Sequence, residues 1–316
     1  MSSENPTIST FDRSCQHWSE EGRLGMEAFY RLAAKDYRQL AQSVQWAEVI
    51  AALRTQFSDR LRVLDVACGS GQFPSALQQY GGWGGSDPAA GDLKIPYTLL
   101  DPSQFSIDTA KQKLTPPFVA ADELLCTAQE LELSSEPFPI VWATHALYCV
   151  PTAELGVAIE KIVAATDLAG LGFIAHASES AHYLKFHQEY LKSKHSSGSV
   201  PYCTAEEVMH TLKSQLSSDQ CLSDQCLSDQ CFFHAIEYDG TVDLADTETA
   251  ERYLQRCLFD DDLTLDEMMA DEHLGPYLRG CIDEANNVWR FRQRTWMMFY
   301  GEHATRASDW ICASSD

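Results

Sequence analysis

The chain has 316 residues, of which 45% are hydrophobic and 22% charged, a composition typical of a folded globular protein and not of a disordered one. Its 23 Lys and Arg against 46 Asp and Glu give a formal net charge of -23. Because nucleic acids and anionic membranes attract proteins through basic surfaces, we expect neither as a partner, whereas so acidic a surface favours solubility and weakly attracts cationic small molecules.

The first half of the chain alternates between helical and strand patterns. Residues 1–22 are polar and are expected to form a flexible N-terminus. Apolar residues then recur at three- and four-residue steps over 23–57, which predicts one or two amphipathic helices that form a lid before the core. The apolar run 61–67 predicts a buried strand, which breaks at glycines and continues as a helix over 72–80.

The pattern of strand followed by helix continues to residue 176. Such alternation predicts a parallel sheet with helices on both faces, and we assign residues 58–176 to this Rossmann-like core. A Gly-rich stretch over 81–96 is expected to be a surface loop. The expected strands are 97–100, 123–126, 138–143 and 171–175, and the expected helices are 103–114 and 152–165.

Residues 177–316 are expected to add insert helices and the strands that complete the sheet and an acceptor pocket. Together the patterns predict an α/β fold with a seven-stranded, mostly parallel sheet whose last strand is antiparallel. The expected helices here are 180–192, 204–216, 248–257 and 277–288, and the expected strands are 232–244 and 294–301.

Eleven cysteines include three in the repeat SDQCL-SDQCL-SDQC at 218–231. Their spacing matches no zinc pattern, so we interpret the repeat as a low-complexity surface loop and expect no metal site. The N-terminus has no apolar segment typical of a signal peptide, and no stretch is long enough to cross a membrane. We therefore expect a cytoplasmic protein whose cysteines are free thiols.

A glycine-containing turn after the first predicted strand indicates a ligand site. The sequence there is Asp65-Val66-Ala67-Cys68-Gly69-Ser70-Gly71. Glycines allow the backbone to turn sharply and to approach a ligand closely at the carboxyl end of a strand. The residue three after Gly71 is Pro74, which departs from the dinucleotide fingerprint G-x-G-x-x-G, and no P-loop pattern is present.

This turn resembles motif I of class I S-adenosylmethionine-dependent methyltransferases, D/E-x-G-x-G-x-G, with Ala67 in place of the first glycine. The resemblance covers about residues 60–176. It implies S-adenosylmethionine as cofactor, with Asp65 orienting the methionine moiety and Ala67, Gly69 and Gly71 passing beneath the cofactor. Asp101 ends the second strand, where the two oxygens of a carboxylate suit the ribose hydroxyls, and Pro102 follows it. Helix capping is the structural alternative for Asp101.

The resemblance extends more weakly to the loops after strands three and four. Thr127 and Gln129 fall where the adenine usually lies. Thr144, His145 and Tyr148 follow the fourth strand, where the methyl group meets its acceptor. An imidazole with an ordinary pKa of about 6.5 suits proton removal, so His145 is the candidate base, and Tyr148 would line the acceptor pocket. A structural histidine and a core tyrosine are the alternatives.

Asp101-Pro102-Ser103 and Leu147-Tyr148-Cys149-Val150 are similar to the histamine N-methyltransferase branch of this family. That similarity implies a small amine as acceptor, held by His145 and by Arg294 on the last strand, although an arginine facing a cationic amine is unfavourable. Tyr30 and Tyr37 are candidate substrate-binding residues of the lid, with simple packing as the alternative.

The chain is therefore expected to methylate the N or O atom of a small molecule, as a monomer or a dimer. Two alternatives stay open. A non-catalytic S-adenosylmethionine-binding protein would retain Gly69, Gly71 and Asp101. An aminopropyltransferase-like enzyme would carry an acidic residue after the fourth strand, where this chain has Thr144 and His145.

Overall fold

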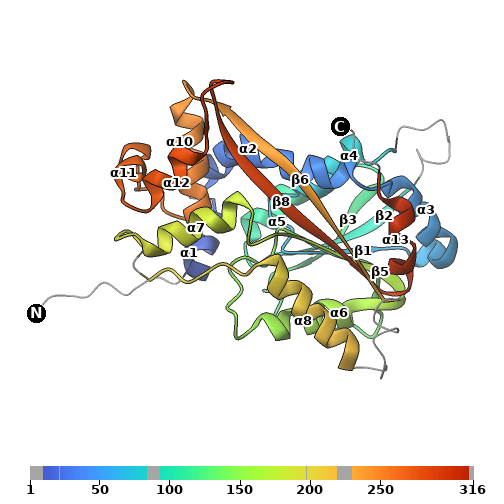
Figure 1. The fold of residues 1–316 in the computed structure, drawn as a ribbon. Helices are drawn as coiled ribbons and strands as arrows, with labels where there is room; N and C mark the ends of the chain where they lie inside the picture. Colours follow the sequence, from blue (N-terminus) through green and yellow to red (C-terminus); the bar gives the residue numbers. More distant parts are fainter. Residues whose placement is uncertain (1–9, 21, 84–92, 197, 219–229, 313–316) are drawn as a thin grey trace, which may run out of the picture.

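The computed structural model describes residues 10–20, 22–83, 93–196, 198–218 and 230–312 (Figure 1). One sheet with the strand order β3-β2-β1-β4-β5-β8-β6 forms the centre, and the short β7 pairs with β8. The strands are β1 (Val63–Val66), β2 (Ile95–Leu100), β3 (Phe118–Leu124), β4 (Phe138–Thr144), β5 (Thr166–Ala177), β6 (Cys231–Asp243), β7 (Ile282–Asp283) and β8 (Val288–Tyr300).

The directions of the strands confirm the predicted α/β class. Strands β1 to β5 pair in parallel, and β8 runs antiparallel to both β5 and β6. Every residue of β1 is buried, as expected for a central parallel strand covered on both faces. Within the described residues, the main path of the sheet therefore has seven strands, of which the last in sequence is reversed, and the carboxyl ends of β1 to β5 lie at one edge.

Helices cover both faces of the sheet and one end of the molecule (Figure 1). They are α1 (Thr10–His17), α2 (Arg23–Gln42), α3 (Trp46–Phe57), α4 (Gln72–Tyr80), α5 (Gln104–Lys113), α6 (Leu155–Ala165), α7 (His182–Lys192), α8 (Ala205–Ser218), α10 (Thr247–Leu258), α11 (Leu265–Ala270), α12 (Leu274–Gly280) and α13 (Ala307–Trp310).

Two apolar clusters bury the faces of the sheet. On one face, α3, α4 and α5 pack through Leu53, Phe73 and Ile107 against side chains of β1, β2 and β4. On the other face, α6 and α8 pack against the alternate residues of the same strands, such as Leu64 and Val141. The period of two along each strand thus sends its side chains into two separate cores.

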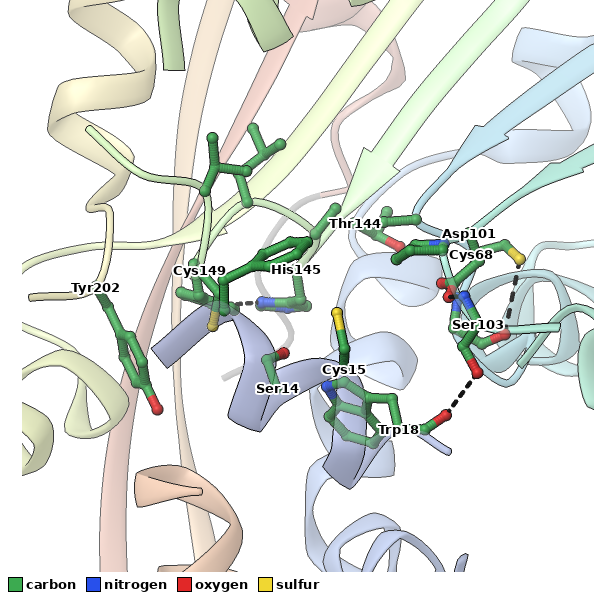
Figure 2. A pocket seen from close by; sticks show the side chains of 18 of the residues that line it. Ser14, Cys15, Trp18, Cys68, Asp101, Ser103, Thr144, His145, Cys149 and Tyr202 are labelled. Carbon is green, nitrogen blue, oxygen red and sulfur yellow. Dashed lines mark hydrogen bonds between the residues drawn. The ribbon is translucent and has the colours of Figure 1, made fainter. Parts of the chain in front are cut away.

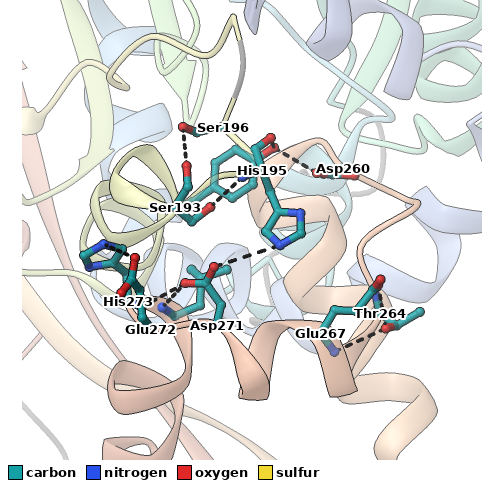
Figure 3. Close-up of polar contacts among 11 residues, drawn as sticks. Ser193, His195, Ser196, Asp260, Thr264, Glu267, Asp271, Glu272 and His273 are labelled. Atoms are coloured by element: carbon teal, nitrogen blue, oxygen red, sulfur yellow. Dashed lines mark hydrogen bonds and ion pairs between the residues drawn. The ribbon is translucent and has the colours of Figure 1, made fainter.

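A third cluster joins α2, α7, α10, α11 and α12 to the far ends of β6 and β8. Polar contacts hold the loop after α7 against this end of the molecule (Figure 3). His195 lies 3.9 Å from the carboxylate of Asp271, which also accepts hydrogen bonds from the backbone N–H groups of His273 and Leu274. This layer lies beside the sheet and supplies one wall of the candidate site.

The structure corrects several sequence expectations. The segment 1–22 was expected to be flexible, but residues 10–17 form α1, where its buried Thr10 and pocket-facing residues hold it in place. The predicted helix 277–288 is wrong, because α12 ends at Gly280 and β7 follows. The third strand begins earlier than predicted, at Phe118. Most of the repeat at 218–231 lies outside the described residues.

Candidate functional site

A cavity opens at the carboxyl ends of β1, β2 and β4, between the sheet and α1 and α2 (Figure 2). Its floor comes from the loops that follow β1, β2, β3 and β4, and its roof comes from the N-terminal helices. Within the described residues it contains most of the side chains that the sequence singled out. The predicted residues that line it are Tyr30, Tyr37, Ala67, Gly69, Asp101, Pro102, Thr127, Gln129, Thr144, His145 and Tyr148.

The turn after β1 runs in the left-handed backbone region at three alternate positions. The φ angles are +53° at Ala67, +51° at Gly69 and +71° at Gly71. A Cβ on Gly69 would meet its nearest neighbour, the Tyr30 hydroxyl, at 3.8 Å, so this glycine borders open space. A Cβ on Gly71 would lie 2.9 Å from the Cα of Ala110 in α5, so this glycine permits helix packing and does not line the cavity.

Asp101, at the end of β2, is almost fully buried. Its two oxygens accept hydrogen bonds of 2.9 Å from the backbone N–H groups of Gly69 and Ser103. Burial raises its pKa to about 6, while these two donors act in the opposite direction. Each carboxylate oxygen can accept a further hydrogen bond, so Asp101 remains able to bind a ligand hydroxyl. Ser103, and not Asp101, is the N-cap of α5.

Asp65 does not line the cavity, contrary to the expectation of a cofactor contact. Its side chain points into the core, where it accepts a 2.7 Å hydrogen bond from the hydroxyl of Tyr97. That hydroxyl in turn accepts a 2.9 Å hydrogen bond from the indole N–H of Trp142. Burial raises the pKa of Asp65 to about 7. The motif acid is therefore a buried structural group beneath the turn.

The loop after β3 presents Thr127 and Gln129 to the cavity. The Thr127 hydroxyl donates to Glu130 at 2.9 Å, and the Gln129 amide donates to Glu154 at 2.8 Å. These acids hold both side chains in place, and Glu130 also accepts from the Thr127 backbone N–H. The loop is thus ordered by its own polar contacts.

His145 follows β4 in a left-handed conformation, with φ +54°, and its ring nitrogen Nδ1 lies 2.7 Å from the Tyr148 hydroxyl. The same hydroxyl accepts a 3.3 Å hydrogen bond from the N–H of Ala177. If Tyr148 donates its hydrogen to Nδ1, Nε2 of His145 carries the remaining proton, and this buried nitrogen has no hydrogen-bond partner among the described residues. Burial, with His176 nearby, lowers the pKa of His145 to about 3, so the ring is neutral.

Helix α1 and the residues after it, including Trp18, form part of the roof. Ser103 Oγ donates to the carbonyl of Trp18 at 2.9 Å (Figure 2), and Ser106 Oγ donates to the same carbonyl at 3.2 Å. The buried guanidinium of Arg256 donates to the carbonyls of His17 and Gly22. These bonds satisfy carbonyl groups at the end of α1 and tie the roof to α5 and α10.

Two expectations about the acceptor side are corrected. Arg294 does not line the cavity, because its side chain is 40% exposed, lies 3.7 Å from Glu237 and stacks over Trp296. Helix α3, assigned to the lid, packs instead in the apolar core on one face of the sheet. Tyr30 and Tyr37 of α2 do line the cavity.

Asp36 lines the cavity and was missed by the sequence reasoning. It lies on the buried face of α2 between Ala33 and Leu40, so an acidic residue within an apolar helical stripe was the available signal. The hydroxyls of Tyr183 and Tyr238 donate to its carboxylate. Burial raises its pKa to about 7.

The described residues carry neither a metal-ligand group nor a membrane-spanning helix. They contain no group of three or more His, Cys, Asp and Glu side chains arranged to hold a metal ion. None of their helices has the length and apolar character needed to cross a membrane.

No family model matches the sequence, and no curated protein matches it. Among solved structures, the chain is similar to a proposed methyltransferase from Bacillus halodurans, with 12% identity over 81% of this chain and 99% of that one and a TM-score of 0.49. It is similar to a plantazolicin methyltransferase in complex with SAH, with 14% identity, 92% and 96% coverage and a TM-score of 0.45. It is also similar to a magnesium protoporphyrin IX methyltransferase from Synechocystis with bound SAM, with 14% identity over 67% of this chain and 88% of that one and a TM-score of 0.41.

Proposed function

We propose that the protein is a class I S-adenosylmethionine-dependent methyltransferase acting on the N or O atom of a small molecule. The observation that carries this proposal is the joining of two strand ends at one cavity. The turn after β1 presents Gly69, and the end of β2 presents Asp101 beside it. The strand order and the reversed β8 agree with the fold that the sequence motif implies.

The residues of the cavity fit the proposed cofactor. Asp101 would accept the ribose hydroxyls, and the open space at Gly69 would receive the part of the cofactor that passes the turn. Thr127 and Gln129 would border the adenine, while Thr144 would lie near the methyl-donating end. Pro102, directly after Asp101, would line the same wall. Asp65 would have an indirect role, because its hydrogen bond with Tyr97 joins β1 to β2 in the core beneath the turn.

When bound, the cofactor supplies a methyl group on a sulfonium, which the lone pair of the acceptor takes as the sulfur–carbon bond breaks. The protein mainly has to align the acceptor and exclude water. The aromatic roof formed by Trp18, Tyr30 and Tyr37 would exclude water from the cavity. The low pKa of His145 and a proton on Nε2 favour a role as a hydrogen-bond donor that orients the acceptor, in place of general base.

Calorimetric titration with S-adenosylmethionine, followed by detection of S-adenosylhomocysteine formed with small-molecule acceptors, tests the proposal. Binding together with turnover supports a methyltransferase. Binding without turnover on any acceptor in a broad metabolite extract favours the non-catalytic alternative. Preference for the decarboxylated cofactor would favour the aminopropyltransferase-like alternative, although the site has Thr144 and His145 where that chemistry would need an acid.

A further inference from the structure

The part of the cavity that faces α2 and α7 contains a buried carboxylate that the cofactor proposal does not use. Asp36 is only 5% exposed, yet it lines the cavity. Most buried acids are neutralised by a cationic side chain. Here the hydrogen-bond donors to Asp36 are the neutral hydroxyls of Tyr183 and Tyr238.

Among the described residues, the cation near Asp36 is Lys35, whose charge favours the ionised carboxylate but which forms no ion pair with it. Lys35, its neighbour on α2, donates to the backbone carbonyl of Asp239 in β6. The other titratable groups that face Asp36 are neutral. They are Tyr37 of α2, Tyr148 of the loop after β4, Tyr183 of α7, Tyr238 of β6, and Tyr253 and Cys257 of α10.

Among the described residues that line the cavity, Arg256 is the one with a cationic side chain, and it already has partners. Its guanidinium donates to the carbonyls of His17 and Gly22 and lies 3.9 Å from Asp261. It also stacks over the ring of Trp18, on the α1 side of the cavity. Its positive charge therefore interacts with the end of α1, the start of α2 and the loop after α10.

Three aromatic rings border both Asp36 and the cavity. Burial, with the nearby Asp36 charge contributing, holds the pKa of Tyr37, Tyr148 and Tyr183 well above the usual range, so all three keep their hydrogens. The rings of Tyr148 and Tyr183 lie 6.3 Å apart, and Tyr37 contacts His145 edge-on at 5.5 Å. Aromatic faces attract cations, most strongly where water is excluded.

We propose that the acceptor is a small organic cation, such as an amine that stays protonated, whose charge is bound by Asp36 among the rings of Tyr37, Tyr148 and Tyr183. A second N or O atom of the same molecule, which keeps its lone pair, receives the methyl group and releases its proton to solvent. The role of the bound cation as methyl acceptor rests on the proposed function, whereas the cation site itself is defined by the residues of the cavity alone. The negative charge of the whole chain would draw such a ligand toward the protein. The placement of Arg294 outside the cavity removes the arginine that had disfavoured a cation.

The test is calorimetric titration of the cofactor-free protein with arylalkylamines, including phenethylamine, each paired with the alcohol of the same skeleton. We expect at least one amine to bind about tenfold or more tightly than its alcohol, because only the amine forms an ion pair in a buried site. Asp36→Asn should remove that preference. Asp260→Asn is the matched control, because Asp260 also accepts from a tyrosine hydroxyl, that of Tyr190 at 2.8 Å, but does not line the cavity.

A second measurement uses the unaltered protein and is independent of whether Asp36→Asn folds. Because a bound cation favours the ionised carboxylate, amine binding at pH 6 should release a proton, and the measured heat should vary with the ionisation enthalpy of the buffer. Amine affinity should rise from pH 6 to pH 8.

Several outcomes would overturn the cation site. They are equal affinity for every amine and its alcohol, an unchanged preference in a folded Asp36→Asn variant, or no proton release on amine binding. A parallel titration of Asp101→Ala separates the two proposals. This variant should lose cofactor affinity and retain amine affinity, so failure of cofactor binding and failure of amine binding are read independently.

Discussion

The carboxylate of Asp101 accepts a 2.9 Å hydrogen bond from the backbone N–H of Gly69, which joins the ends of β2 and β1 at the rim of the cavity. The same carboxylate accepts from Ser103, so two backbone donors fix its orientation before any ligand arrives. A preorganised acceptor loses little conformational freedom on binding. This relationship is the physical basis of the proposed cofactor site.

Replacing Asp101 by Ala should weaken S-adenosylmethionine binding by about 2–3 kcal/mol, because two charge-assisted hydrogen bonds to the ribose would be lost. The Kd from calorimetry checks this. Part of the loss would arise because the Gly69 N–H loses its acceptor. Asp101→Asn keeps an oxygen acceptor, so its affinity for S-adenosylmethionine should lie between those of the unaltered protein and Asp101→Ala. Full affinity in Asp101→Ala would move the ribose contact to another residue.

The two glycines of the turn should respond differently to substitution. Gly69→Val should abolish cofactor binding, because its branched side chain would enter the ligand space, where a Cβ has no neighbour closer than 3.8 Å. Gly71→Ala should instead reduce the melting temperature, because its Cβ would lie 2.9 Å from Ala110. Binding and thermal unfolding measured on both variants test this separation. A Gly69→Val protein with normal affinity would refute the placement of the cofactor.

Ala67 is held at φ +53°, a conformation that costs a residue with a Cβ about 1–2 kcal/mol. Ala67→Gly should therefore stabilise the protein by about 0.5–1 kcal/mol after the greater flexibility of glycine in the unfolded chain is subtracted. Ala51→Gly is the control, since this exposed position in α3 should be destabilised by about 1 kcal/mol. Chemical denaturation gives both values, and equal signs for the two variants would contradict the argument.

The buried carboxyl of Asp65 should make stability depend on pH. Its pKa is raised to about 7 in the folded protein, so the folded state binds a proton more tightly than the unfolded state. This contribution is complete below the ordinary pKa of about 4 and is lost as the pH rises through 7. Asp65→Asn should reduce the fall in unfolding free energy between pH 5 and pH 8 by about 1–3 kcal/mol. Parallel pH curves for the two proteins would show that Asp65 titrates normally.

The neutral ring of His145 should contribute no ionisation near pH 6.5 to catalysis, because burial lowers its pKa to about 3. His145→Gln, which retains an N–H donor, should lower kcat/KM and leave the shape of its pH profile unchanged. The profile is measured once an acceptor is found. Loss of a protonation step near neutral pH in this variant would instead identify His145 as the general base.

Local patterns predicted the sheet and the motif-bearing loops well, because strand–helix alternation and the turn at residues 65–71 are short-range signals. Asp101, Thr144 and His145 follow strands that pair in parallel, so their convergence on one edge follows from topology. Asp65, which we expected to contact the cofactor, lies outside the cavity lining for a related reason. Its direction depends on the alternation of side chains along β1 and on the partner Tyr97, 32 positions away.

The roof and the cation site depend on contacts between distant segments. Asp36 of α2 meets Tyr183 across 147 positions, and Arg256 meets His17 across 239. The apolar periodicity of a single segment cannot predict contacts between residues so far apart in the sequence. The short helices α1 and α11 also escaped prediction, because one or two turns carry too little apolar repeat to be distinguished from a loop.

The most direct test of the central claim is calorimetric titration of the unaltered protein with S-adenosylmethionine, with S-adenosylhomocysteine and NAD as competitors. We predict saturable binding at one site per chain, displacement by S-adenosylhomocysteine, and no displacement by NAD. Absence of binding, or displacement by the dinucleotide, would contradict the assignment of the cavity at Gly69 and Asp101 to the methyl donor.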